Sequence, residues 1–292
     1  MFVRVHSDLV LFSLVLSTFF CVGCALVDSL LGFWVFLELA GLSIIPCFFY
    51  VSGFDNLNFY SSLLIYVVMS GLSSVFLITG VIFLGLYYLI LVGFIIKLGL
   101  FPFSIWVYFV FASSNWIFIF LVSVILKFPI LFFSFLLQEN GVCESVLYVD
   151  CFLTIFLCSG LFWLYSLSWE YVWCHISLSS VSTLLVACFC AEFIITSFVY
   201  AYYFIWATAC VWYFFYLKRM GGVKEWFWLF CFLFLITPLS LPLFYKLSVC
   251  LSILYSSIYI LIMWSFYSLS EQFFLYKLAG DEYLSCTYNV WY

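Results

Sequence analysis

Apolar residues fill nearly the whole chain, and short polar interruptions divide it into segments about as long as a membrane is thick. About 20 apolar helical residues cross a bilayer core of about 30 Å. The pattern therefore predicts an all-α integral membrane protein with about ten transmembrane helices and no soluble domain. The predicted segments are 9–27, 30–51, 59–81, 84–111, 115–137, 147–166, 171–190, 193–217, 226–251 and 257–277.

The composition excludes a water-soluble globule. Of the 292 residues, 69% are hydrophobic and 7% are charged, which leaves too little polar surface to face water. The thirteen cysteines are scattered through apolar runs, which favours small hydrophobic side chains over metal or redox sites. Phe, Cys, Val, Leu, Tyr and Trp have codons rich in T and G, and their abundance suggests an organelle gene.

Charges outside the apolar segments predict the orientation of the chain. With about ten spans, the basic residues all fall on one side of the membrane and the acidic loop residues on the other. By the positive-inside rule the basic side, which also holds both termini, faces the matrix or cytoplasm. The basic set is Arg4, Lys218, Arg219, Lys224 and Lys277, and the acidic set is Asp28, Glu139, Glu144 and Glu192.

Two halves of the chain share one pattern, a membrane lysine close to proline. We expect one transmembrane domain over 1–277, built from repeats at about 1–140 and 141–277, and a short tail at 278–292. Five helices in each repeat would invert one repeat relative to the other, as in transporters with inverted repeats. The matching positions are Lys97 with Pro102, and Lys246 with Pro238 and Pro242.

Four ionisable side chains inside the apolar segments are the candidates for chemistry. A charge at the centre of a membrane helix costs about 2.5–3.5 kcal/mol on insertion scales, and packing alone does not require it. Removal from water disfavours the charged forms of carboxylates and amines, so both can exchange protons. Nearby prolines expose backbone carbonyls that water can solvate. The pattern predicts a proton relay of Glu38, Lys97, Lys127 and Lys246.

Structural roles are the alternative for the same residues. Glu38 would then only bond neighbouring helices, and Lys127 or Lys246 would extend to the lipid headgroups. His175, in the sequence WCHISLSSVS, fits an auxiliary relay group and a hydrogen-bonded structural residue equally well.

Several of these residues stand in motifs with a characteristic order. The motifs are Trp34, Glu38 and Ile45-Pro46; Lys97, Leu98, Gly99, Pro102, Phe103 and Trp106; Ser114-Asn115-Trp116 with Lys127 and Pro129; and Pro238, Pro242 and Lys246. In this order the sequence resembles the NADH dehydrogenase subunit 2 family. The similarity covers most of the chain and is most specific between Lys97 and Pro129.

This resemblance implies an antiporter-like fold with broken helices. It also implies a subunit of respiratory complex I, the NADH:ubiquinone oxidoreductase that couples quinone reduction to proton pumping. By it, Glu38 corresponds to the family's membrane glutamate, and Lys97, Lys127 and Lys246 to its central and distal lysines. Two histidines common in the family are replaced here, one by Ser104 and the other near Thr183. Water bound to these hydroxyls would take over their part.

The resemblance further implies where the protein works and with what. It would be a multi-pass protein of the mitochondrial inner membrane, with other membrane subunits of complex I and lipids as partners, and without nucleic acid or a second copy of itself. NADH, FMN, iron–sulfur clusters and ubiquinone would be bound by other subunits. This sequence has neither a Gly-rich nucleotide fingerprint nor an iron–sulfur cysteine run, so we expect no redox centre in it.

Three rival functions share part of this pattern. Haem-bearing respiratory subunits need several membrane histidines, and the chain has only two histidines. The sister antiporter-like subunits of the same complex share the charge pattern but are usually longer. A free-standing cation/proton antiporter would need paired membrane carboxylates, and the sequence predicts Glu38 to be nearly alone.

We predict that Arg4, Lys218 and Tyr292 lie on the same side of the membrane, the matrix side, because an even number of spans separates them. Accessibility labelling from each side of sealed vesicles checks this. Labelling of the Lys218 loop from the side opposite to the N-terminus would overturn the predicted topology.

Overall fold

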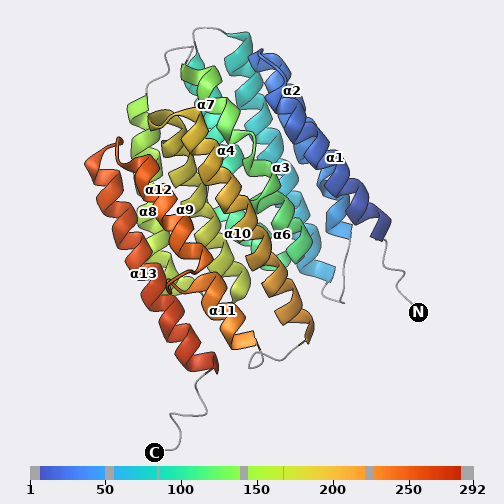
Figure 1. Ribbon diagram of the computed structural model, residues 1–292. Coiled ribbons are helices and arrows are strands. Elements are labelled where there is room, and N and C mark those ends of the chain that lie inside the picture. The colour runs from blue at the N-terminus through green and yellow to red at the C-terminus, as the bar shows by residue number, and fades with distance from the viewer. Residues whose placement is uncertain are drawn as a thin grey trace, which may run out of the picture.

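The computed structural model describes residues 7–49, 56–83, 86–138, 144–166, 168–220 and 226–283, and every regular element in this part of the chain is helical. The helices form one bundle (Figure 1). The first half contains α1 Ser7–Ala25, α2 Leu30–Ser43, the 3-10 helix η1 Ile45–Phe49, α3 Asn56–Ile82, α4 Tyr87–Leu98, α5 Ile105–Ser113, α6 Trp116–Ser123, the 3-10 turn η2 Ile125–Lys127 and α7 Ile130–Gln138. The second half contains α8 Glu144–Tyr165, α9 Trp169–Cys190, α10 Phe193–Met220, α11 Phe227–Phe234, α12 Leu241–Ile253 and α13 Ile258–Tyr283.

The expected all-α membrane architecture is confirmed in its coarse form. Within the described residues, eight helical segments are long and apolar enough to cross a membrane. The two other predicted segments each consist of two shorter helices, α4 with α5 and α11 with α12. The number of crossings and the orientation therefore stay predictions. Arg4, Glu139, Lys224 and Tyr292, on which the orientation partly rests, lie outside the described residues.

Helix α4 ends at a sharp break that the sequence encodes. Gly99 has a φ of 71°, in the left-handed region that glycine adopts without strain, and its N–H bonds the carbonyls of Ile95 and Ile96. A side chain at Gly99 would also collide with Val107. The indole N–H of Trp106 donates to the Ile96 carbonyl at 3.0 Å. The carbonyls that precede Lys97 are therefore satisfied by N–H groups of the break itself and by the side chain of Trp106.

A second break separates α11 from α12. Leu239 has a φ of 68°, and Ser240 is the N-cap of α12, whose first turn contains Pro242. Proline fits the first turn of a helix because the N–H there has no intrahelical partner. Both breaks thus occur at the prolines that the sequence analysis singled out.

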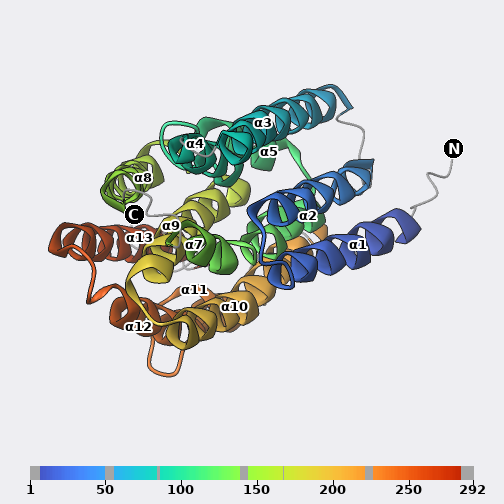
Figure 2. The same cartoon turned by 90° about the horizontal axis from the view of Figure 1, so that it is seen from above.

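Helix α9 is the central element of the bundle. It lies among the other helices when the bundle is seen from above (Figure 2), and it contacts α5, α7, α8, α10 and α12. Almost all of it is buried. Its Ser and Thr hydroxyls donate to carbonyls three or four residues earlier in the same helix, as Ser177 does to Cys174 and Thr183 to Ser180. Each hydroxyl keeps its acceptor lone pairs. A buried apolar core therefore contains a strip of hydrogen-bond acceptors.

The last helix is longer than predicted. The sequence predicts a segment that stops at 277, with a tail from 278, whereas α13 continues to Tyr283. The polar stretch around residue 271 therefore lies within the helix and not at its end.

Helices α3 and α4 pack closely because α4 has a glycine at their contact. A Cβ atom on Gly93 would lie 2.8 Å from the Leu77 backbone nitrogen and 2.9 Å from the Ser73 carbonyl oxygen. We predict that Gly93→Ala destabilises the protein by about 1–3 kcal/mol, because the two backbones must move apart. Gly71→Ala in α3 is the matched control, since no atom lies within 4 Å of the new Cβ. Thermal unfolding in detergent micelles checks this, and equal melting temperatures for both variants would contradict the close packing.

Candidate functional site

A buried ion pair joins α2 to the end of α4. The Lys97 ammonium lies 2.5 Å from the Glu38 carboxylate, and the two side chains are 8% and 19% exposed. Lys97 is in the last turn of α4, where the helix dipole favours a positive charge. Gly41, one turn after Glu38, leaves space here, since a Cβ on it would stand 3.5 Å from the Lys97 nitrogen. The structure therefore brings together two residues that are 59 positions apart in sequence.

Lys127 lies in the 3-10 turn η2 between α6 and α7 and is held in a different way. Its side chain donates to the Ser177 carbonyl and the Tyr203 hydroxyl, each at 2.7 Å. The residue is 3% exposed, so it does not extend to the lipid headgroups. Among the described residues no carboxylate lies within ion-pair distance of it. A buried ammonium is thus stabilised here by two neutral oxygen atoms and by the ring of Tyr203, whose centroid lies 4.4 Å from the Lys127 nitrogen.

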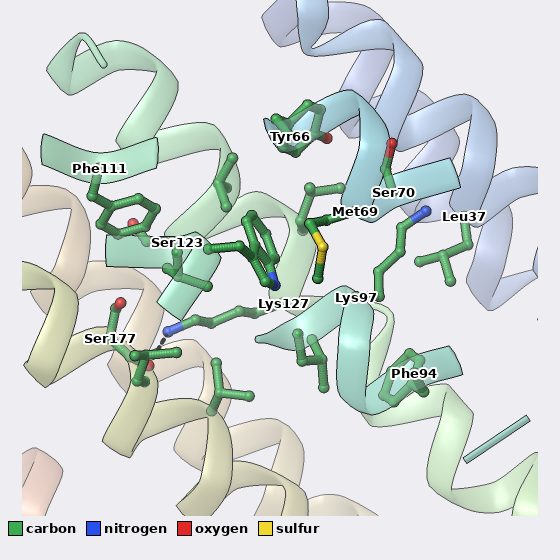
Figure 3. Close-up of a pocket in the computed structure, with 17 residues that line it drawn as sticks. Leu37, Tyr66, Met69, Ser70, Phe94, Lys97, Phe111, Ser123, Lys127 and Ser177 are labelled. Atoms are coloured by element: carbon green, nitrogen blue, oxygen red, sulfur yellow. Dashed lines mark hydrogen bonds between the residues drawn. The ribbon is translucent and has the colours of Figure 1, made fainter. Parts of the chain in front are cut away.

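A small cavity lies between these two lysines. Its volume is about 50 Å³, and its polar lining comes from Tyr66, Ser70, Ser123, Ser177 and the lysines themselves. A cavity needs roughly 10–15 Å³ to hold one water molecule, so this one has room for water. Figure 3 shows the two amines pointing to opposite sides, that of Lys97 away from Lys127 and that of Lys127 toward Ser177.

A second buried ion pair joins α12 to α13. The Lys246 ammonium in α12 is 2.8 Å from the Glu271 carboxylate in α13, with 9% and 3% of the side chains exposed. The alternative that Lys246 extends to the headgroups is therefore wrong. Glu271 is absent from the residues that the sequence singled out, although it lies inside the predicted segment 257–277.

Two tyrosines connect the middle lysine to this second pair. Tyr203, whose hydroxyl accepts from Lys127, has its ring 5.8 Å from the ring of Tyr245, the neighbour of Lys246. The Tyr245 hydroxyl lies close to those of Ser180 and Thr183 on α9 but has no hydrogen-bond partner among the described residues. The polar groups form one line from α2 through α9 to α13.

His175 and Ser104 lie outside this line. His175 is buried on α9, its Nδ1 is 2.8 Å from the Tyr108 hydroxyl, and its Nε2 has no partner among the described residues. The residue is held between α5 and α8, since Tyr108 also approaches Cys158 at 3.9 Å. Ser104 is buried at the start of α5 and does not line the cavity. Both remain predictions as auxiliary relay groups.

The expectation that Glu38 is nearly alone among membrane carboxylates is wrong. Besides Glu271, Asp150 in α8 is buried, and one of its carboxylate oxygens has no partner in the described part of the chain. An aspartate within the apolar run VLYVDCFLTIF was the signal for it. The three carboxylates lie on different helices, and the described residues hold no group of three or more His, Cys, Asp or Glu side chains suited to a metal ion.

Comparison with known proteins places the fold. No protein-family profile and no curated protein sequence matches the chain. Among solved structures it is similar to a chain of respiratory complex I from Thermus thermophilus with bound aureothin, with a TM-score of 0.67. The chain has the fold of a complex I chain. The match covers 91% of this chain and 74% of the Thermus chain. The two sequences are 14% identical, so the similarity shows a shared fold only. The description of the site therefore rests on the contacts and distances within this chain.

The pair of Glu38 and Lys97 makes a prediction about stability. We expect Lys97→Met or Glu38→Met alone to cost about 3–5 kcal/mol, because each leaves one buried charge without its partner. The double variant should be close to the parent in stability, since it leaves no unpaired charge. Chemical unfolding in micelles measures all three free energies. The control is the Lys218–Glu170 pair, whose lysine is 64% exposed, and its removal should cost about 0–1 kcal/mol. Additive effects of the Glu38 and Lys97 changes would contradict the coupling.

Proposed function

We propose that this chain is a proton-translocating membrane subunit of respiratory complex I. The observation that carries the proposal is Lys127, a buried lysine held by neutral oxygens between two Lys–Glu pairs. A helix bundle with a purely structural role has no use for this arrangement, because apolar residues fill a membrane interior at lower free energy. The shared fold supports the same assignment.

In the proposed mechanism, the Glu38–Lys97 pair is the point of control. While the pair is closed, Glu38 stabilises the ammonium and holds it pointing away from Lys127. When the carboxylate moves away, Lys97 loses its compensating charge and the desolvated amine releases its proton more readily. Its flexible side chain is then free to turn toward the cavity. Opening of the ion pair thus sets both the direction and the driving force of the transfer.

Water in the cavity would carry the proton from Lys97 to Lys127. A chain of hydrogen bonds through water is needed here, because the two amines point apart. The Ser177 carbonyl and the Tyr203 hydroxyl stabilise the charged amine without neutralising it, so Lys127 can pass the proton on. Tyr203, Tyr245 and the hydroxyls of α9 lead from Lys127 to Lys246, the distal lysine.

A free-standing cation/proton antiporter is the alternative, and the additional buried carboxylates are the observation in its favour. Each of Glu38 and Glu271 is already paired with a lysine, and Asp150 lies on another helix. A metal cation bound by oxygen needs several oxygen ligands converging on one point, whereas a relay needs single groups in series. The arrangement of the carboxylates therefore favours the relay.

The remaining parts of the proposal rest on the sequence. The motifs favour subunit 2 over its sister antiporter-like subunits. The abundance of residues whose codons are rich in T and G favours a mitochondrial gene, and hence the mitochondrial inner membrane. The distribution of charges favours both termini in the matrix. The two inverted repeats, at about 1–140 and 141–277, would each supply one helix break and one lysine close to it. The other membrane subunits and lipids would cover the exposed apolar faces, and NADH, FMN, the clusters and ubiquinone would be bound elsewhere in the complex.

Replacement of Lys97 tests the proposed function. We predict that Lys97→Met leaves a complex that oxidises NADH but pumps far fewer protons per NADH, because the site that must gain and lose a proton is gone. Lys97→Arg should also fail, since arginine keeps its proton under these conditions. The measurement is proton uptake per NADH oxidised by the purified complex in sealed vesicles.

The exposed Lys218→Met variant is the matched control and should pump like the parent. If both Lys97 variants also assemble and pump like the parent, Lys97 is structural and the proton-relay function is wrong.

A further inference from the structure

Helix α13 presents two consecutive polar residues to the second helix break. Glu271 and Gln272 are both buried and lie within α13, which ends only at Tyr283. Neither residue belongs to the relay that the sequence predicted. Two buried polar side chains on a membrane helix need partners, and both have them on the broken segment.

Gln272 closes the end of α11. Its side-chain oxygen accepts from the Ile236 N–H at 2.9 Å, and its side-chain nitrogen donates to the Phe234 carbonyl at 3.2 Å. These backbone groups lack helical partners because α11 ends at Phe234. One amide therefore satisfies both a donor and an acceptor of the break and fixes α13 beside it.

Glu271 holds the other side of the same break. Its carboxylate lies 2.8 Å from the amine of Lys246, an ion-pair contact without hydrogen-bond angles. Lys246 stands six residues after Ser240, the N-cap of α12. Because Gln272 already fixes the contact between α13 and the break, the packing does not require a charge at position 271. An apolar pair at 246 and 271 would be as stable as the ion pair or more stable.

We propose that Glu271 is the proton acceptor of Lys246 and the terminal group of the buried line. This inference rests on the proposed proton-relay function. The Lys246 N–H bond breaks, an O–H bond forms on Glu271, and the ion pair becomes a neutral amine beside a neutral carboxylic acid. Both forms of the pair carry no net charge, so the transfer leaves no uncompensated charge in the membrane. The next proton arriving at Lys246 restores its ammonium, and loss of the proton from Glu271 restores the pair.

Three variants test this assignment in the assembled complex in sealed vesicles. They are Glu271→Gln, the double variant Lys246→Met with Glu271→Met, and the control double variant Lys218→Met with Glu170→Gln. The double variant at 246 and 271 removes both charges together, so it should assemble even if Glu271→Gln does not. We expect it to oxidise NADH with a proton yield as low as that of Lys97→Met, and the control to match the parent.

Infrared difference spectra during NADH oxidation give an independent signature. The parent should show the carbonyl band of a protonated carboxylic acid, and the Glu271 variants should lose it. A structural role for the pair would not produce this band.

The possible outcomes separate this inference from the proposed function. If Lys97→Met abolishes pumping but the double variant at 246 and 271 pumps like the parent, Glu271 is a structural partner only, and the relay stands without it. Failure of this charge-free variant to assemble would equally show that the pair serves the structure, and would overturn the assignment. If Lys97→Met itself pumps normally, the relay function fails and this inference fails with it.

Discussion

A charge inside a bilayer has to be compensated within the protein, and this constraint explains most of the structure. Each uncompensated charge at a helix centre costs about 2.5–3.5 kcal/mol on insertion scales, and the lipid core has no water to lower this free energy. Lys97 and Lys246 are compensated by carboxylates from neighbouring helices, and Lys127 by two neutral oxygens. Each of these contacts joins different helices, so the charges also help to fix the bundle.

The helix breaks follow from the same constraint. Lys97 lies in the last turn of α4, just before Gly99, and Lys127 lies in a 3-10 turn. The regular helical hydrogen bonds are interrupted at both places. A break frees backbone carbonyls, which are strong acceptors for an ammonium or for water. The central helix α9 adds hydroxyls that are bonded to their own helix but can still accept. Polar groups at membrane depth are thereby concentrated along one line, and the remaining surfaces stay apolar.

The sequence alone predicted those features that depend on single segments. Apolar runs and prolines located the helices and both breaks, and membrane charges identified Glu38 and three lysines. The sequence alone did not predict which segments pair with each other, because no pattern in it indicates that α13 faces α12. Glu271 was missed for this reason, although it lies inside the predicted segment 257–277. Its neighbours Ser270 and Gln272 are also buried or partly buried in contacts with other helices, such as the bonds of Gln272 to the break.

The proposed relay depends on a continuous polar line between Lys97 and Lys127, which requires ordered water in the cavity between them. A high-resolution electron cryomicroscopy map of the native particle would show that cavity with the lysines in place. We expect density for water within hydrogen-bonding distance of the cavity's polar lining, with Ser123 and Ser177 among its partners. A cavity closed by apolar side chains, with no water between the two lysines, would contradict it.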